Sequence, residues 1–157
     1  MIAEEAGISE PGLIHHFPTK PALLLEALDY HHMRTFSQAM TAEAASFAEH
    51  LVNLAAGHER DPRFIRFLLV LGAEAIDPAH PAHEWYVTRY ERVRIGMERQ
   101  FAADQGARLL RADVDTALLA RQTMAMMDGL ELQFLLSSGE VDVVTPLTAW
   151  LAPFYVR

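Results

Sequence analysis

The stretch IAEEAGISEPGLIHHFPTK, residues 2–20, decides how the rest of the chain is interpreted. It predicts a short helix over Ile2–Ala6 that stops at Gly7, a residue suited to the left-handed conformation after a helix end. Ser9 is a good N-cap for a second short helix that runs to about His16. Two short helices joined by a tight turn are typical of the back half of a helix-turn-helix, whose second helix presents its N-terminal residues to the major groove of DNA.

Downstream of this motif nearly every segment has helical periodicity, and the Pro and Gly residues fall between the periodic runs. We therefore expect an all-α fold, with a partial helix-turn-helix head over residues 1–18 and a helical-bundle body over residues 19–157. The first expected body helix is capped by Thr19 and ends near Met40, and the second covers Thr41–Ala56 and stops at Gly57. A third begins at Asp61-Pro62, and a long fourth ends near Asp104. The last two cover about 115–137 and 142–155.

Composition and charge restrict the class of protein. The chain has 157 residues, of which 51% are hydrophobic and 22% charged, as in an ordinary globular protein, and it has no cysteine for disulfides or thiolate metal sites. No apolar run approaches the ~20 residues that span a bilayer, and no signal-peptide pattern is present, so we expect a soluble, cytoplasmic protein without membrane contact. The net charge of −8 argues against nucleic-acid binding by the whole surface.

The motif of residues 2–20 resembles the DNA-binding head of the TetR family of transcriptional regulators. Members of that family typically have a pattern such as I-A-x-x-A-G-V-S-x-x-x-L-Y-x-H-F-x-S-K-x-x-L at this place. The identical positions here are Ile2, Ala3, Ala6, Gly7, Ser9, Leu13, His16, Phe17, Lys20 and Leu23. A looser similarity to the family extends over Asp77–Arg94 and from Arg111 into the methionine-rich helix expected at about 115–137.

The resemblance implies which residues meet operator DNA. Ser9, His15, His16 and Lys20 fall where the family contacts phosphates, whereas Glu10, Pro11 and Gly12 fall where it contacts base edges. Ile14 replaces the family's usual tyrosine and so lacks a hydroxyl that would reach a phosphate. Glu10 also places a carboxylate toward DNA, which opposes binding.

Two further departures bear on DNA binding. The family's head has three helices, and this chain is expected to begin at the second. Residues 1–36 carry five carboxylates and two basic side chains, a net charge of −3, which is unfavourable beside phosphates.

Aromatic and methionine side chains lie on facing stripes of consecutive predicted helices. Plain core packing explains each of them separately, but the resemblance implies a cavity for a small, mainly apolar effector between these helices. The residues expected to line it are Phe64, Phe67, Tyr86, Tyr90, Met97 and Met127.

The segment at about 115–137 is apolar over more than half its circumference, which predicts cover from a second subunit as well as from its own core. The resemblance implies a homodimer through the helices at about 115–137 and 142–155. We expect no catalytic residues, no cofactor and no metal site, because Asp77, His80, His83 and Glu84 are more simply loop residues and no nucleophile elbow or phosphate-binding glycine loop occurs.

Two functions remain open at this point. The first is a DNA-binding transcriptional regulator, expected to be a repressor, that responds to a small, mainly apolar effector. The alternative is a dimeric small-molecule-binding module without effective DNA binding, which the shortened and acidic head favours.

Overall fold

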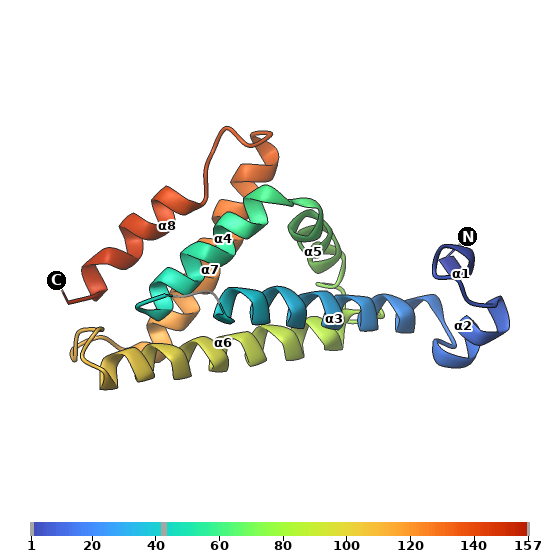
Figure 1. The fold of residues 1–157 in the computed structure, drawn as a ribbon, viewed down its shortest axis with the longest axis horizontal. Coiled ribbons are helices and arrows are strands. Elements are labelled where there is room, and N and C mark those ends of the chain that lie inside the picture. Colours follow the sequence, from blue (N-terminus) through green and yellow to red (C-terminus); the bar gives the residue numbers. More distant parts are fainter. Residues whose placement is uncertain (1, 42–43, 157) are drawn as a thin grey trace. The chain divides into compact units, whose positions relative to one another are not determined.

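A computed structural model describes residues 2–41 and 44–156, and it confirms the all-helical fold (Figure 1). Within these residues, extended pairing is confined to an isolated bridge between Leu110 and Tyr155. The helices are α1 (Ile2–Glu5), α2 (Glu10–His16), α3 (Lys20–Thr41), α4 (Phe47–Arg60), α5 (Arg63–Glu74), α6 (His83–Gly106), α7 (Thr116–Leu136) and α8 (Val144–Leu151), followed by a 3₁₀ turn (Ala152–Phe154).

The chain divides into two compact units, residues 1–35 and 36–157. In the first unit the predicted turn chemistry is confirmed. Gly7 has a φ of +68°, so it closes α1 in the left-handed conformation that glycine adopts without steric cost. The Ser9 hydroxyl oxygen accepts a hydrogen bond from Gly12 N at 3.2 Å, and Thr19 Oγ1 accepts one from Ala22 N at 3.2 Å. Both hydroxyl residues cap the helices that the sequence predicted for them.

The predicted helix over Thr41–Ala56 is wrong at both ends, since α4 runs from Phe47 to Arg60. Its start is fixed by a capping box, in which Ser46 Oγ accepts from Glu49 N at 3.3 Å and Glu49 Oε2 accepts from Ala45 N at 2.7 Å. Gly57 lies inside the helix rather than after it, because α4 continues for one further turn.

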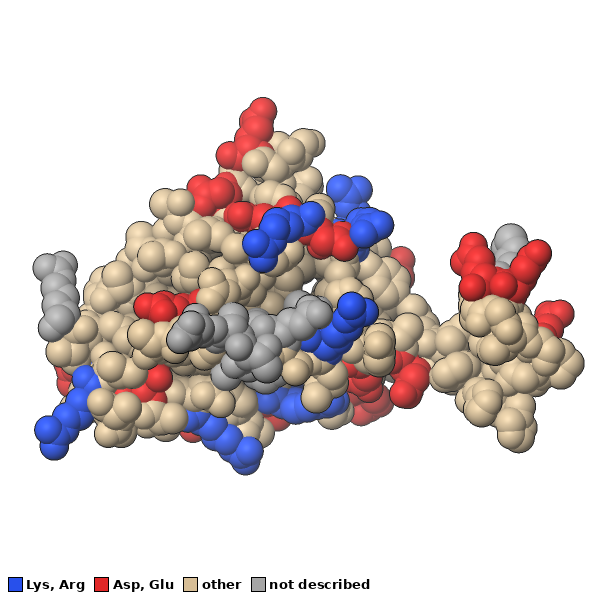
Figure 2. Space-filling view, viewed as in Figure 1, with Lys and Arg blue, Asp and Glu red and all other residues tan. Residues whose placement is uncertain are grey.

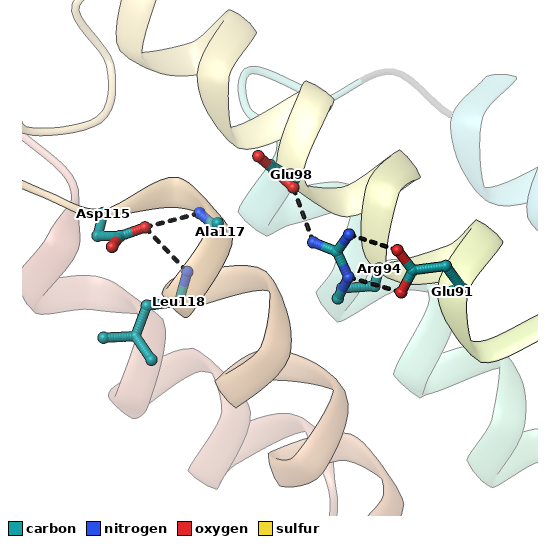
Figure 3. A network of polar contacts seen from close by, with 6 residues as sticks. All are labelled: Glu91, Arg94, Glu98, Asp115, Ala117 and Leu118. Atoms are coloured by element: carbon teal, nitrogen blue, oxygen red, sulfur yellow. Dashed lines mark hydrogen bonds and ion pairs between the residues drawn. The ribbon is translucent and has the colours of Figure 1, made fainter.

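The later boundaries follow the prediction more closely. Asp115 caps α7 by accepting hydrogen bonds from Ala117 N and Leu118 N, both at 3.0 Å (Figure 3). The last predicted helix is shorter than expected. The chain tightens into the 3₁₀ turn after Leu151, where Pro153 has no N–H with which to continue the α-helical hydrogen bonds.

The core of the second unit lies between α4, α6, α7 and α8. Phe101 of α6 is fully buried and meets Phe47 of α4 edge-on, with ring centroids 5.0 Å apart. Around this pair lie buried aliphatic side chains from all four helices, including Leu51, Ala55, Met97, Leu119, Ala120, Met127, Leu130, Leu147 and Leu151. Burying these side chains is the main stabilising term for the body.

Polar contacts between distant segments fix the ends of these helices. Asp104 Oδ2 accepts from Phe47 N at 2.8 Å and from the Tyr155 hydroxyl at 2.7 Å, which ties the start of α4 and the C-terminal segment to the end of α6. Glu59 Oε1 accepts from Val143 N at 2.5 Å, so a side chain of α4 caps α8. No helix within residues 2–41 and 44–156 combines the length and the apolar character needed to cross a membrane.

Candidate functional site

The residues predicted to meet DNA lie on the surface of the first unit. Seven of the eight are exposed, and Gly12 is half-buried beneath the Ser9 cap. A Cβ atom at Gly12 would lie 3.1 Å from Ser9 Oγ, so the absence of a side chain there keeps the cap undisturbed. His15 and His16 follow each other at the end of α2, with ring centroids 5.5 Å apart, and Lys20 begins α3. Their role in DNA contact stays a prediction.

The surface around these residues is acidic and partly apolar. No residue of α1 or α2 is buried, and Ile2, Ile8 and Ile14 are exposed by 51%, 44% and 56%. On the face drawn in Figure 2, this part of the chain shows acidic side chains and no basic ones. In and around α2, positive charge for a DNA contact therefore comes from Lys20, with His15 and His16 beside it.

The six residues predicted to line an effector cavity do not share one environment. Met97 and Met127 belong to the main core. Tyr86 is buried and donates its hydroxyl hydrogen to Leu68 O at 2.8 Å, and its ring packs against Gly72 of α5. Phe67 and Tyr90 are exposed by 40% and 39%, and Phe64 is half-buried. Tyr86 and Tyr90 lie near each other, with centroids 6.5 Å apart.

The two tyrosines belong to a polar cluster whose other members the sequence interpretation did not name as site residues. We call it the α6–α7 cluster; it consists of His58, Trp85, Tyr86, Arg89, Tyr90, Asp128 and Glu131. The Tyr90 hydroxyl donates to Asp128 Oδ2 at 2.9 Å, and His58 Nδ1 lies 2.6 Å from Glu131 Oε1. The Arg89 guanidinium carbon lies 5.9 Å from the Trp85 ring centroid and 5.7 Å from that of Tyr90, within cation–π range.

Burial shifts the titration of this cluster. It raises the pKa of Tyr86 to about 12 against a smaller opposing effect of Arg89. It also raises the pKa of the Asp128 carboxyl, which Glu131 raises further and which the hydrogen bond from Tyr90 and the charge of Arg89 partly offset. Perturbed groups that share an aromatic environment mark a candidate binding site.

The Asp128→Asn substitution is expected to change the pH dependence of stability. Because the folded-state pKa of Asp128 is raised, the folded chain holds this proton at a pH where the unfolded chain has lost it. The free energy of unfolding of the unsubstituted protein should therefore fall, relative to the variant, as pH rises from about 4 toward neutrality. Thermal unfolding across this range measures the difference.

The control for this prediction has the opposite sign. Arg111 lowers the pKa of the exposed Asp113, so Asp113→Asn should make the unsubstituted protein gain stability over the variant as pH rises. Parallel pH profiles for the two variants would contradict the assignment of Asp128.

A second candidate surface follows α7 and α8. A groove of about 430 Å³ is lined by Gln122, Ala125, Met126, Gly129, Leu130, Gln133 and Trp150. On the same helix Leu118, Leu132 and Leu136 are exposed by 52%, 47% and 77%. We call this surface the α7–α8 face. An apolar face of this kind is typical of a protein–protein contact.

Other polar side chains near α6 have structural partners. His83 Nδ1 lies 2.8 Å from Ala75 O, and His80 Nδ1 accepts from Ala82 N at 3.2 Å, so both rings hold the loop before α6. Arg94 pairs with Glu91 at 2.6 Å and with Glu98 at 2.8 Å along α6 (Figure 3). These are local ion pairs between residues three and four positions apart on one helix.

Comparison with solved structures supports the fold. The chain is similar to a putative TetR-family regulator from Rhodococcus sp. (20% identity, TM-score 0.79, 99% of this chain and 85% of that one). It also resembles a putative transcriptional regulator from Saccharomonospora viridis in complex with choline (24% identity, TM-score 0.72, 99% of this chain and 85% of that one). A third similar structure is Salmonella enterica GusR (24% identity, TM-score 0.73, 97% of this chain and 81% of that one). At these identities the likeness establishes the fold alone. Among curated proteins, none matches this chain.

Family models match both parts of the chain. Residues 1–27 match the model described as bacterial regulatory proteins, tetR family, which covers α1, α2 and the start of α3. Residues 34–151 match the model described as BetI-type transcriptional repressor, C-terminal, which covers most of the second unit. The helix-turn-helix pattern and the helical body thus lead to the same assignment, and the chain belongs to the TetR family of bacterial transcriptional regulators.

Proposed function

We propose that this chain is a homodimeric repressor of the bacterial cytoplasm that binds operator DNA through α2 and releases it when a small molecule binds the body. Members of the TetR family typically act as dimers that bind DNA and small effectors. The observation that carries the proposal is the capped helix-turn-helix of the first unit, whose predicted contact residues lie on its surface. In this proposal the chain has a regulatory role and no catalytic one.

The division of labour that we propose is a DNA-binding head over residues 1–18 and a ligand-binding and dimerisation domain over 19–157. Ser9, His15, His16 and Lys20 would contact phosphates, Glu10, Pro11 and Gly12 would face the base edges, and Ile14 would lie at the family's tyrosine position beside the backbone without a hydroxyl to reach a phosphate. Their exposed positions around one short helix support this proposal. A symmetric dimer would place two such helices on successive major grooves about one helical turn apart.

The Lys20→Ala substitution is expected to weaken operator binding about equally for all sequences. Lys20 is the basic side chain nearest α2, and one lost phosphate contact should reduce the slope of log affinity against log salt by about one. Fluorescence anisotropy with DNA flanking the chain's own gene, at several salt concentrations, measures both quantities. Arg99→Ala, an exposed cation of α6, should leave the slope unchanged. An unchanged slope for Lys20→Ala would remove this lysine from the interface.

For the effector we propose a small ligand with a large apolar part that binds the body near Phe64, Phe67, Tyr86, Tyr90, Met97 and Met127. The nearness of Tyr86 to Tyr90 and the perturbed titration of Tyr86 support a site at this end of α6. The choline complex of the similar Saccharomonospora viridis protein is consistent with small-molecule binding by a body of this fold.

A second candidate function is a dimeric ligand-binding module without effective DNA binding. The acidic first unit and its exposed isoleucines favour this alternative. The DNA titration separates the two functions. Specific binding that falls steeply with salt supports the repressor, whereas a stable dimer that binds no DNA at low salt supports the module.

A further inference from the structure

The α6–α7 cluster contains two buried hydrogen-bond donors without an acceptor. Among the residues that the structure describes, Trp85 Nε1 and Arg89 Nε have no hydrogen-bond partner. They lie four residues apart on α6, one helical turn, so they share a face of the helix. A buried donor left unpaired is costly, and in native proteins it is frequently explained by a functional role.

Each carboxylate of the same cluster has one oxygen paired with a side chain other than Trp85 or Arg89. Asp128 accepts from the Tyr90 hydroxyl at 2.9 Å, and Glu131 lies 2.6 Å from His58 Nδ1. Neither contact involves Trp85 Nε1 or Arg89 Nε, so an acceptor brought by a ligand would complete these two donors. A ligand that completes it must bring an oxygen or a comparable lone pair.

The charge of Arg89 and the aromatic rings around it restrict the chemical class of the ligand further. Arg89 lies against both Trp85 and Tyr90, so the cation–π positions on these rings are already taken by a positive side chain. A cationic ligand would have to displace that charge, whereas an anion would gain a charge-assisted hydrogen bond from it. The neighbouring rings of Trp85, Tyr86 and Tyr90 provide an aromatic wall for a flat apolar group.

We propose that the effector is an organic carboxylate with an aromatic ring, whose carboxylate oxygens accept from Trp85 Nε1 and Arg89 Nε and whose ring packs against Tyr86 and Tyr90. This inference rests on the proposed function of the body as an effector-binding domain, and it names the chemical class of the effector. Arg89 Nε has no hydrogen bond to break, so the side chain can turn toward a ligand without losing a partner at that atom.

Isothermal titration calorimetry of the full chain tests this class directly. The probes are benzoate, phenylacetate and indole-3-acetate, their neutral amides benzamide, phenylacetamide and indole-3-acetamide, and choline. We expect at least one carboxylate to bind about 10-fold or more tightly than its amide, because the amide lacks the charge that strengthens the bond to Arg89. Binding of choline with none of the three carboxylates, or binding of no probe, overturns the proposal.

Variants locate the site. Arg89→Met should weaken the bound carboxylate about 10-fold or more, and Trp85→Phe, which keeps a ring but removes the N–H, should weaken it several-fold. Arg99→Met removes the same charge from an exposed position of the same helix and should change nothing. Circular dichroism confirms that each variant is folded. Carboxylate binding that Arg89→Met leaves unchanged would place the ligand elsewhere.

Measuring operator affinity beside carboxylate binding distinguishes a failure of this inference from a failure of the proposed function. If the chain binds its operator but Arg89→Met leaves effector binding intact, the carboxylate site fails and the repressor stands. If carboxylates bind through Arg89 but never alter DNA affinity, the site stands and the coupling to DNA fails.

Discussion

The Ala125→Glu variant is expected to be a monomer at concentrations where the unsubstituted protein is a dimer. Ala125 is exposed in the single chain and lines the groove on the α7–α8 face. In a two-fold symmetric dimer the same patch occurs on both subunits, so one substitution introduces two carboxylates into the contact. Each would lose its hydration without gaining a partner, at a cost of several kcal/mol. Sedimentation velocity of both proteins measures the outcome.

The matched control is Ala102→Glu, which changes an exposed alanine on α6, away from this groove. It introduces the same charge and should leave the dimer intact, and both variants should keep their helical circular dichroism because neither alanine is buried. The Ala125→Glu monomer should also lose most of its operator affinity, since only one head contacts DNA at a time. A dimeric Ala125→Glu protein would mean that the subunits meet through another surface.

Local chemistry made most of the helices predictable. Gly7, Ser9, Thr19 and Asp115 end or cap helices within a few residues of themselves, so the sequence alone contains the relevant information. The start of α4 had a local signal too, because Ser46 and Glu49 have the spacing of a capping box. The prediction placed the end of this helix at Gly57, which lies inside α4.

The α6–α7 cluster was only half predictable. The periodicity of α6 places Tyr86 and Tyr90 on one stripe, and Trp85 and Arg89 lie one helical turn apart on the same helix. The burial of Arg89 Nε depends on how α6 packs with the rest of the body, which no local pattern records. His58 and Glu131 are 73 positions apart, so their contact likewise required the fold.

The Asp104→Ala substitution tests the most connected of these long-range contacts. Asp104 accepts from Phe47 N and from the Tyr155 hydroxyl, which are 57 and 51 positions away in the chain. Removing the carboxylate leaves two half-buried donors without this acceptor, and each such loss costs about 1–3 kcal/mol. We expect a total destabilisation of roughly 2–4 kcal/mol, measured by chemical denaturation at fixed protein concentration.

Two further variants separate this network from a general effect of losing an acid. Asp113→Ala removes an exposed carboxylate whose pairing with Arg111 is screened by solvent, so it should be nearly neutral. Tyr155→Phe removes the hydroxyl that donates to Asp104 and accepts from Ala48 N at 3.2 Å, but it leaves the bond from Phe47 N in place, so its effect should be comparable to that of Asp104→Ala. In the double variant the losses should not add, because both substitutions remove the same hydrogen bond. Additive losses would show that Asp104 and Tyr155 stabilise the body independently, and the C-terminal segment would then be held by Leu110 and the backbone rather than by this carboxylate.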